Sequence, residues 1–315
     1  MQLATQQRDE EVIHKRQAAT MGSKLCIVLA LLVHQSSAFL PGPPIGRPHK
    51  AIMLSEMSQD GASISADANM ESTYASLVDR LISRYERQSA ANGLQNNQLF
   101  VGIAGGPGSG KSTLAGAVAQ RINKLMQTDE GAAACVCLPM DGFHYTRAEL
   151  QSIGNSPDNS YTYEDLLARR GAPWTFDAEG CINKFTEARV NGNASLPIYS
   201  RVKSDPVEDG VTLNSETKIV LLEGNYLLSW RDSRWQPLQA NNVFDETWYI
   251  SCKNLADQRE RLVRRHLETW SEEKTKMWGS GEEGAGAKAD ANDMLNLVWI
   301  DEMSKGYADL TIEST

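Results

Sequence analysis

Apolar and polar residues alternate along the chain in two different periods from residue 99 onwards. Short unbroken apolar runs are typical of buried strands, and an apolar residue at every third or fourth position is typical of an amphipathic helix. Strands are predicted at 99–104, 135–140, 218–222, 246–252 and 308–312, and a turn at 191–192 leads into a further short run at 196–200. Helices are predicted after residue 112 and at 163–170, 178–190, 255–270 and 293–303. This alternation predicts an α/β fold, with a mostly parallel sheet flanked by helices.

A helix with a single apolar stripe precedes the first strand. Ser72 is predicted to cap its N-terminus and Asn92-Gly93 to end it. The stripe consists of Tyr74, Leu77, Val78, Leu81, Ile82 and Tyr85. We expect it to pack against the sheet beside the first strand.

Two stretches show neither period. Residues 203–216 form a polar stretch that precedes the predicted strand at 218–222. Residues 271–291 contain few apolar residues and have glycine at 279, 281, 284 and 286. That composition predicts a mobile lid and not a second domain.

The first 70 residues differ from the rest of the chain. After a polar start, Lys24 precedes an apolar run at 25–33, and Ser36-Ser37-Ala38 has the small side chains of a cleavage site. This is the layout of a signal peptide over 21–38, and its apolar run is shorter than the roughly twenty residues that span a bilayer. We therefore predict a leader over 1–70, one domain over 71–315, and no membrane association of the mature form.

The residues after the apolar run add a targeting hypothesis. Phe39 directly follows the predicted cleavage point, and a tail rich in Pro, Ser and Ala, with early basic residues, comes next. This arrangement resembles the bipartite plastid leader of algae with secondary plastids. The predicted localisation is the plastid, and the alternative is a cytoplasmic protein with an extension of no targeting value.

Charge and cysteine content narrow the function classes. The 315 residues carry a net charge of −9, which argues against a general nucleic-acid-binding surface. The five cysteines form no Cys-x-x-Cys pair, so neither a disulfide framework nor a zinc site is supported. We expect a small-molecule substrate and no nucleic-acid partner, and the composition is compatible with a homodimer.

The strongest functional signal lies where the first predicted strand ends. The spacing Gly-x-x-x-x-Gly-Lys-Ser between a strand and a helix is that of a phosphate-binding loop, or P-loop. The predicted nucleotide-binding residues are Gly105, Gly106, Pro107, Gly108, Ser109, Gly110, Lys111, Ser112 and Thr113. The glycines let successive N–H groups approach one phosphate, and the helix N-terminus adds donors and a favourable dipole.

The side chains of the loop predict its cofactors. Lys111 is expected to face solvent in the empty site and to reach the β- and γ-phosphates of ATP, and the Ser112 hydroxyl is expected to bind Mg²⁺. The chain has no Asn-Lys-x-Asp segment, so GTPase chemistry is poorly supported.

Two carboxylates are predicted to face the same crevice. Asp141 and Glu223 each follow a predicted strand, and ligands of open parallel sheets bind beyond the carboxyl ends of the strands. A carboxylate at that edge can orient Mg²⁺ or take the proton of an attacking hydroxyl. The alternatives are that Asp141 is an ordinary turn residue before Gly142 and that Glu223 neighbours a helix N-cap.

A basic stripe lies on the predicted helix 255–270. Arg261, Arg264 and Arg265 have the spacing of one helix face. They form either a solvated face paired with nearby glutamates or a positive clamp on a transferring phosphoryl group beside the lid.

These motifs, taken in order, resemble one family. The chain from about residue 99 to 312 is similar to the phosphoribulokinase, uridine kinase and pantothenate kinase group of P-loop kinases, and is nearest the bacterial fructose-kinase-like and yeast kinase-like branch. The matching segments are 105–113, Met140-Asp-Gly-Phe-His144, Arg169-Arg-Gly-Ala-Pro-Trp-Thr-Phe-Asp177, Leu196-Pro-Ile-Tyr-Ser-Arg201, Ile219-Val-Leu-Leu-Glu-Gly224, Arg261-Leu-Val-Arg-Arg265 and Asn292-Asp293. The resemblance implies a P-loop NTPase fold with a mobile lid.

The resemblance also implies roles for single residues. Asp141 matches the catalytic carboxylate near the acceptor hydroxyl, and Glu223 matches the acidic residue near Mg²⁺ and the acceptor. Arg261 and Arg265 match the lid helix that closes on ATP, which places Arg265 with Lys111 among the catalytic residues. The implied acceptor-binding residues are His144, Arg170, Tyr199, Arg201 and Glu223.

The sequence therefore predicts a kinase that transfers the γ-phosphoryl group of ATP to a hydroxyl of a small metabolite. A sugar, a sugar acid, a nucleoside and a pantothenate-like compound all remain open as the acceptor. The alternative functions are a nucleotide-hydrolysing switch and a non-catalytic nucleotide-binding protein.

Overall fold

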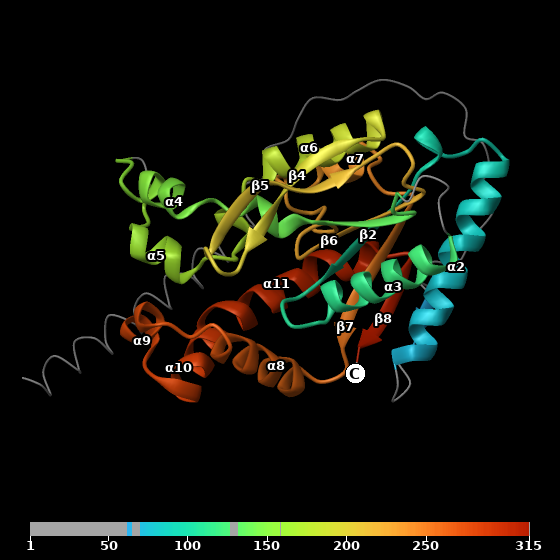
Figure 1. Cartoon of the computed structure of the whole chain (residues 1–315). Helices are drawn as coiled ribbons and strands as arrows, with labels where there is room; N and C mark the ends of the chain where they lie inside the picture. The colour runs from blue at the N-terminus through green and yellow to red at the C-terminus, as the bar shows by residue number, and fades with distance from the viewer. Residues whose placement is uncertain (1–61, 65–69, 127–131, 158, 315) are drawn as a thin grey trace, which may run out of the picture. The chain divides into compact units, whose positions relative to one another are not determined.

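The computed structural model describes residues 62–64, 70–126, 132–157 and 159–314 (Figure 1). The signal-like segment 21–38 lies outside the described residues, as does nearly all of the predicted leader. None of the helices in the described residues has the length and apolar character needed to cross a lipid bilayer.

A six-stranded sheet forms the centre of the molecule, with the strands in the order β1-β8-β7-β2-β6-β3. All of its neighbouring strands pair in parallel, which confirms the predicted α/β architecture. The strands are β1 (Ala62–Ile64), β2 (Leu99–Gly105), β3 (Cys135–Pro139), β6 (Ile219–Gly224), β7 (Glu246–Cys252) and β8 (Leu310–Ser314). Strand β1 lies N-terminal to the boundary expected at residues 70 and 71 and adds an edge to the sheet through β8.

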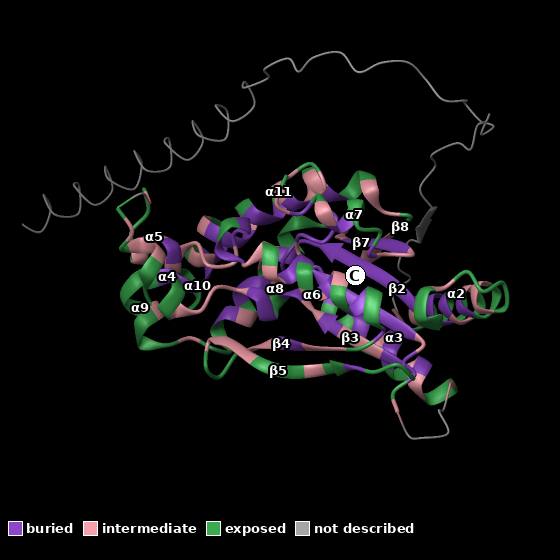
Figure 2. Cartoon of the chain, turned by 90° about the horizontal axis from the view of Figure 1, so that it is seen from above, coloured by how far each residue is buried: buried purple, intermediate pink, exposed green. Residues whose placement is uncertain are grey.

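Helices cover both faces of this sheet, so its central strands are buried (Figure 2). On one face, α2 (Met70–Ala90) and α3 (Lys111–Leu125) bury Leu77, Leu81 and Val118 against alternate residues of β2. The predicted stripe of α2 thus packs as expected, but the helix begins at Met70 and Ser72 lies in its first turn instead of at its cap. On the other face lie α6 (Ala178–Asn191), α7 (Pro237–Ala240) and α11 (Met294–Ser304).

A separate antiparallel hairpin pairs β4 (Ala194–Ser200) with β5 (Asp205–Leu213), so the polar stretch at 203–216 contains a strand that its sequence pattern did not predict. Most β5 residues are exposed or half-buried, so the strand has no apolar periodicity to reveal it. Two short helices also belong to this end of the molecule, α4 (Arg147–Gly154) and α5 (Tyr163–Ala168) (Figure 1). Each begins with a threonine capping box. Short 3₁₀ turns lie at Gln95–Asn97, Met140–Phe143 (η2), Pro173–Thr175 and Lys305–Tyr307.

The predicted lid is helical in the structure. After α8 (Leu255–Leu267) the chain forms α9 (Glu272–Trp278), α10 (Gly281–Lys288) and a π-helical turn at Ala289–Asp293. A small apolar cluster anchors this segment, in which Ala285 and Ala289 pack on Leu262 and Val263 of α8. A β-carbon at Gly284 would lie 2.4 Å from the Gly279 carbonyl oxygen, so this glycine permits close packing of α10 and is not a sign of disorder.

Candidate active site

The carboxyl ends of β2, β6 and β3 meet at one edge of the sheet. In the strand register, Glu223 near the end of β6 pairs with Ile103 of β2 and with Pro139 of β3. The loop after Gly105 and the side chain of Asp141 therefore come to the same edge as Glu223. All three elements contribute to the lining of one cavity of about 460 Å³, which we call the first cavity.

The loop has the geometry of a phosphate-binding loop. A β-carbon at Gly105 would lie 2.4 Å from the Ile250 carbonyl oxygen, so only glycine fits at the exit of β2. Gly110 has a φ of +90° and stands directly before α3, whose first residue is Lys111. Gly105, Gly106 and Ser109 are buried, whereas Gly108, Gly110, Ser112 and Thr113 line a second cavity of about 380 Å³.

Lys111 does not face solvent, in contrast to the expectation from the sequence. Its residue is only 8% exposed, and its Nζ donates to the Gly106 carbonyl at 3.1 Å and to Oδ1 of Asn225 at 2.8 Å. Burial lowers the pKa of Lys111, and the nearby carboxylates of Glu223 and Asp141 oppose this effect. The ammonium group is thus held in place by main-chain and amide oxygens at the mouth of the phosphate loop.

Glu223 is a buried carboxylate beside an accessible hydroxyl. Oε1 of Glu223 accepts a hydrogen bond of 3.0 Å from Oγ of Ser112. Burial, and secondarily the charge of Asp141, raise the pKa of Glu223. A bound cation would relieve both effects.

These groups fit a magnesium site that is shared with a nucleotide. No group of three or more His, Cys, Asp or Glu side chains in the described ranges is placed to hold a metal alone. Mg²⁺ is usually held by one or two protein oxygens, with substrate phosphates and waters as its other ligands. Ser112 and Glu223 offer that set.

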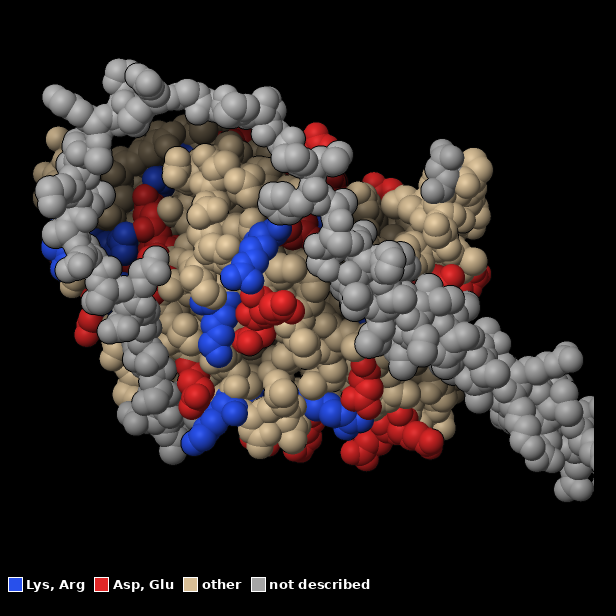
Figure 3. All heavy atoms as spheres, turned by 180° about the vertical axis from the view of Figure 1, so that it is seen from behind, with Lys and Arg blue, Asp and Glu red and all other residues tan. Residues whose placement is uncertain are grey.

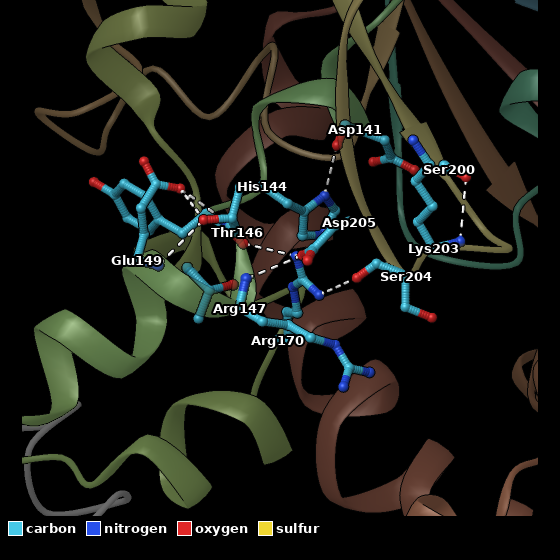
Figure 4. Close-up of polar contacts among 12 residues, drawn as sticks. Asp141, His144, Thr146, Arg147, Glu149, Arg170, Ser200, Lys203, Ser204 and Asp205 are labelled. Carbon is cyan, nitrogen blue, oxygen red and sulfur yellow. Dashed lines mark hydrogen bonds and ion pairs between the residues drawn. The ribbon is translucent and has the colours of Figure 1, made fainter.

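Asp141 lies on η2 with its side chain exposed to the first cavity. Its main-chain oxygen is 2.8 Å from Nδ1 of His144 (Figure 4), and the His144 ring packs against Phe176 with centroids 3.9 Å apart and an angle of 39° between the ring planes. Desolvation lowers the pKa of His144. Position 142, next to Asp141, requires a glycine, because a β-carbon there would lie 2.0 Å from the Pro197 carbonyl oxygen of β4.

The other predicted acceptor-binding residues line the same cavity but differ in how many contacts their side chains already make within the protein. Arg170 donates to the main-chain oxygens of Tyr145 and Ser204 and to Oδ1 of Asp205 (Figure 4), so its guanidinium ties the segment after α5 to Tyr145 and to the hairpin. The Arg170 guanidinium carbon lies over the Tyr199 ring, 5.4 Å from the ring centroid. Burial raises the pKa of Tyr199. Arg201 is exposed and lines both cavities.

Helix α8 is docked on the phosphate loop. Nε2 of Gln258 donates to the Pro107 carbonyl at 2.8 Å, and Leu262 packs close to Gly108. Arg261 lines the second cavity, and Arg265 lines both. The structure thus places the predicted arginine clamp beside the loop.

Comparisons with known proteins agree with this arrangement. No family model matches the chain. A Schizosaccharomyces pombe protein named "Putative uridine kinase C227.14" is 30% identical over 249 residues, which cover 76% of this chain and 90% of that protein. The chain belongs to the uridine kinase and pantothenate kinase group of P-loop kinases.

Two solved structures support the fold of this kinase. A structure titled as a "putative fructose transport system kinase" from Silicibacter sp. TM1040 has 29% sequence identity and a TM-score of 0.54, and the match covers 68% of this chain and 89% of that one. YFH7 from Saccharomyces cerevisiae, described as "a putative P-loop containing kinase with a circular permutation", has a TM-score of 0.60 at 18% sequence identity, and the match covers 77% of this chain and 99% of that one. The chain is an ATP-dependent small-molecule kinase.

Sequence reasoning missed several residues that line the first cavity or hold the phosphate loop. Asn225 directly follows the end of β6, so its position alone could have identified it as a residue of the site. Gln258 is one turn before Arg261, on the face of α8 that meets the loop. Lys274 and Lys288 had no local signal, because they reach the first cavity only through the folding of α9 and α10.

Proposed function

We propose that this kinase moves the γ-phosphoryl group of ATP to a hydroxyl of a small metabolite bound in the first cavity. The observation that carries the proposal is that Lys111 and Ser112 of the phosphate loop line the same cavity as Asp141 and Tyr199. A phosphoryl donor and a hydroxyl acceptor can therefore meet without crossing a protein wall. Phosphoryl transfer needs positioning and charge stabilisation more than covalent chemistry from the protein.

Each group has a defined part in this proposal. Lys111 and Arg265 stabilise negative charge on the phosphates, and Ser112 with Glu223 would hold Mg²⁺, which supplies further charge stabilisation when bound. Asp141 orients the acceptor hydroxyl and takes its proton, because its exposed carboxylate lines the first cavity together with Lys111 and Ser112 of the phosphate loop.

The second cavity is the proposed site of the ribose and base of ATP. Its lining includes Gly108, Gly110 and Thr113, and also Arg261 and Arg264 of α8. The first cavity then remains for the acceptor, with His144, Arg170, Tyr199 and Arg201 in its wall. The proposal leaves sugars, sugar acids, nucleosides and pantothenate-like compounds as candidate acceptors.

A screen of these metabolites with coupled detection of ADP tests the proposal. We expect ADP release to require an acceptor and to be lost in Lys111→Met, while Lys124→Met, at an exposed position on the same helix, keeps full activity. ADP release without any acceptor would favour the hydrolysing switch. ATP binding with no turnover on any acceptor would favour a non-catalytic protein.

Targeting to a plastid remains a separate proposal, supported by the order of basic, apolar and small residues over 21–38. A reporter fused to residues 21–70 should enter the secretory route or the plastid. A diffuse cytosolic signal would contradict it.

A further inference from the structure

The first cavity is richer in positive charge than the rest of the protein. The chain as a whole has a net charge of −9, and on the described part of the face in Figure 3 acidic and basic side chains are interspersed. The lining of the first cavity instead has more lysine and arginine than carboxylate side chains. The cations are Lys111, Arg147, Arg170, Arg201, Arg265, Lys274 and Lys288, and the carboxylates are Asp141, Glu223, Glu273 and Asp293.

ATP accounts for only some of these cations. Lys111, Arg201 and Arg265 line both cavities, so they lie where the proposed nucleotide and acceptor meet. Lys274 and Lys288 line the first cavity alone. They come from α9 and α10, which form most of the segment 271–291 that the sequence predicts as a mobile lid.

Neighbouring carboxylates neutralise most of the remaining charge. Arg170 pairs with Asp205 at 2.7 Å, and Arg147 pairs with Glu273 at 3.1 Å. Asp293 is shared by three groups: Nε2 of His266 at 2.8 Å, Arg265 at 3.7 Å and Nζ of Lys288 at 4.0 Å. Lys288 is the most distant of the three, so it is only partly neutralised.

Lys274 has no carboxylate partner among the ion pairs of the described residues. Its Nζ donates to the carbonyl and hydroxyl oxygens of Thr269, both of which are neutral. Desolvation, followed by repulsion from Lys288 and Arg147, lowers the pKa of Lys274. Burial also lowers the pKa of Lys288. Two ammonium groups that repel each other in one cavity wall are stabilised by an anion between them.

We propose that the acceptor carries a carboxylate or phosphate group that binds at Lys274 and Lys288, while its hydroxyl lies at Asp141. This inference rests on the proposed function and narrows the acceptor to an anionic hydroxy compound. A neutral nucleoside or sugar would leave Lys274 without a carboxylate partner and Lys288 only partly neutralised by Asp293, and would bind more weakly.

Turnover with matched acceptor pairs tests the inference. Suitable pairs are glycerate and glycerol, gluconate and glucose, pantothenate and its alcohol analogue, ribose 5-phosphate and ribose, and uridine monophosphate and uridine. We expect the charged member of the productive pair to have the higher kcat/KM, and the carboxylate and phosphate pairs show which anion is recognised. A productive pair whose neutral member is preferred would overturn the inference.

Lysine variants locate the anion. Lys274→Met and Lys288→Met should each raise KM for the charged acceptor about tenfold or more and leave KM for ATP unchanged, because a hydrogen bond between two charged groups is lost. Lys288→Arg should restore most of the affinity. Lys276→Met, an exposed position on α9 outside both cavities, is the matched control and should behave as wild type. Equal KM values in all four variants would overturn the inference.

A binding measurement separates this inference from the proposed function. With the phosphate loop saturated by a non-hydrolysable ATP analogue and Mg²⁺, calorimetry should detect binding of inorganic phosphate to the wild type and to Lys276→Met. Binding should weaken at least fivefold in Lys274→Met and in Lys288→Met. If no acceptor is turned over but phosphate binds in this lysine-dependent way, the proposed function fails and the anion site stands. Absent or lysine-independent phosphate binding overturns the anion site.

Discussion

Replacing Asp141 with asparagine separates a catalytic role from a structural one. The substitution keeps the shape of the side chain and removes its negative charge and its ability to accept a proton. The hydrogen bonds of Asp141 among the described residues are made by its main-chain oxygen, which receives His144 N at 3.3 Å and lies 2.8 Å from His144 Nδ1. Both contacts survive in Asp141→Asn.

The expected magnitudes follow from this geometry. An exposed side chain without structural hydrogen bonds changes the free energy of unfolding by about 0.5 kcal/mol or less, which is roughly 2 °C in Tm for a domain of this size. General-base help is worth about 100- to 10,000-fold in rate. We therefore expect kcat to fall about 100-fold or more, while Tm and the Kd for ATP stay close to wild type.

The assay combines thermal unfolding, calorimetry with a non-hydrolysable ATP analogue, and coupled ADP detection with the acceptor found in the screen. Asp79→Asn, an exposed position on α2 away from both cavities, controls for the loss of one negative charge. A folded Asp141→Asn protein with full phosphoryl transfer would refute the reasoning and leave Glu223 as the remaining carboxylate candidate. A loss of stability with normal kcat would instead make Asp141 a turn residue.

Three further predictions follow from the contacts of the site. Glu223→Gln should abolish turnover but raise Tm at pH 8 more than at pH 4. Because the folded protein raises the pKa of Glu223, the stability that the protonated carboxyl contributes is lost as the pH rises through that pKa, whereas glutamine does not ionise. An equal effect of the substitution on Tm at both pH values would contradict this. Gly142→Ala should lower both Tm and kcat, since the new β-carbon would lie 2.0 Å from the Pro197 oxygen. Wild-type values of Tm and kcat in this variant would show that β4 moves aside at little cost. Amide hydrogens of α9, which has no buried residue, should exchange faster than those of α10 and become protected when an ATP analogue binds; exchange unchanged by the analogue would count against a lid.

The sequence was sufficient for features that depend on local motifs. The phosphate loop, Asp141 and Glu223 could be placed because a parallel sheet brings strand ends to one edge whatever the details of packing. The hydrogen bond that Lys111 donates to Asn225 could not be predicted, because the two residues lie 114 positions apart.

Other features needed the three-dimensional contacts themselves. Strand β5 carries polar residues on both faces and is a strand only because β4 pairs with it. The helices α9 and α10 have weak apolar patterns and depend on close packing around Gly284. The two cavity lysines on these helices were missed for the same reason.

The contact between Gly142 and Pro197 links the proposed base to the hairpin. Because the chain beside Asp141 touches the main chain of β4, the carboxylate and the β4–β5 hairpin should shift together as a unit. The nucleotide-facing elements β2, α3 and α8 are held by separate contacts, such as that between Gln258 and Pro107. A change of acceptor specificity, in evolution or by grafting the hairpin of another kinase, could therefore be made on one half of the protein while the half that faces ATP is left intact.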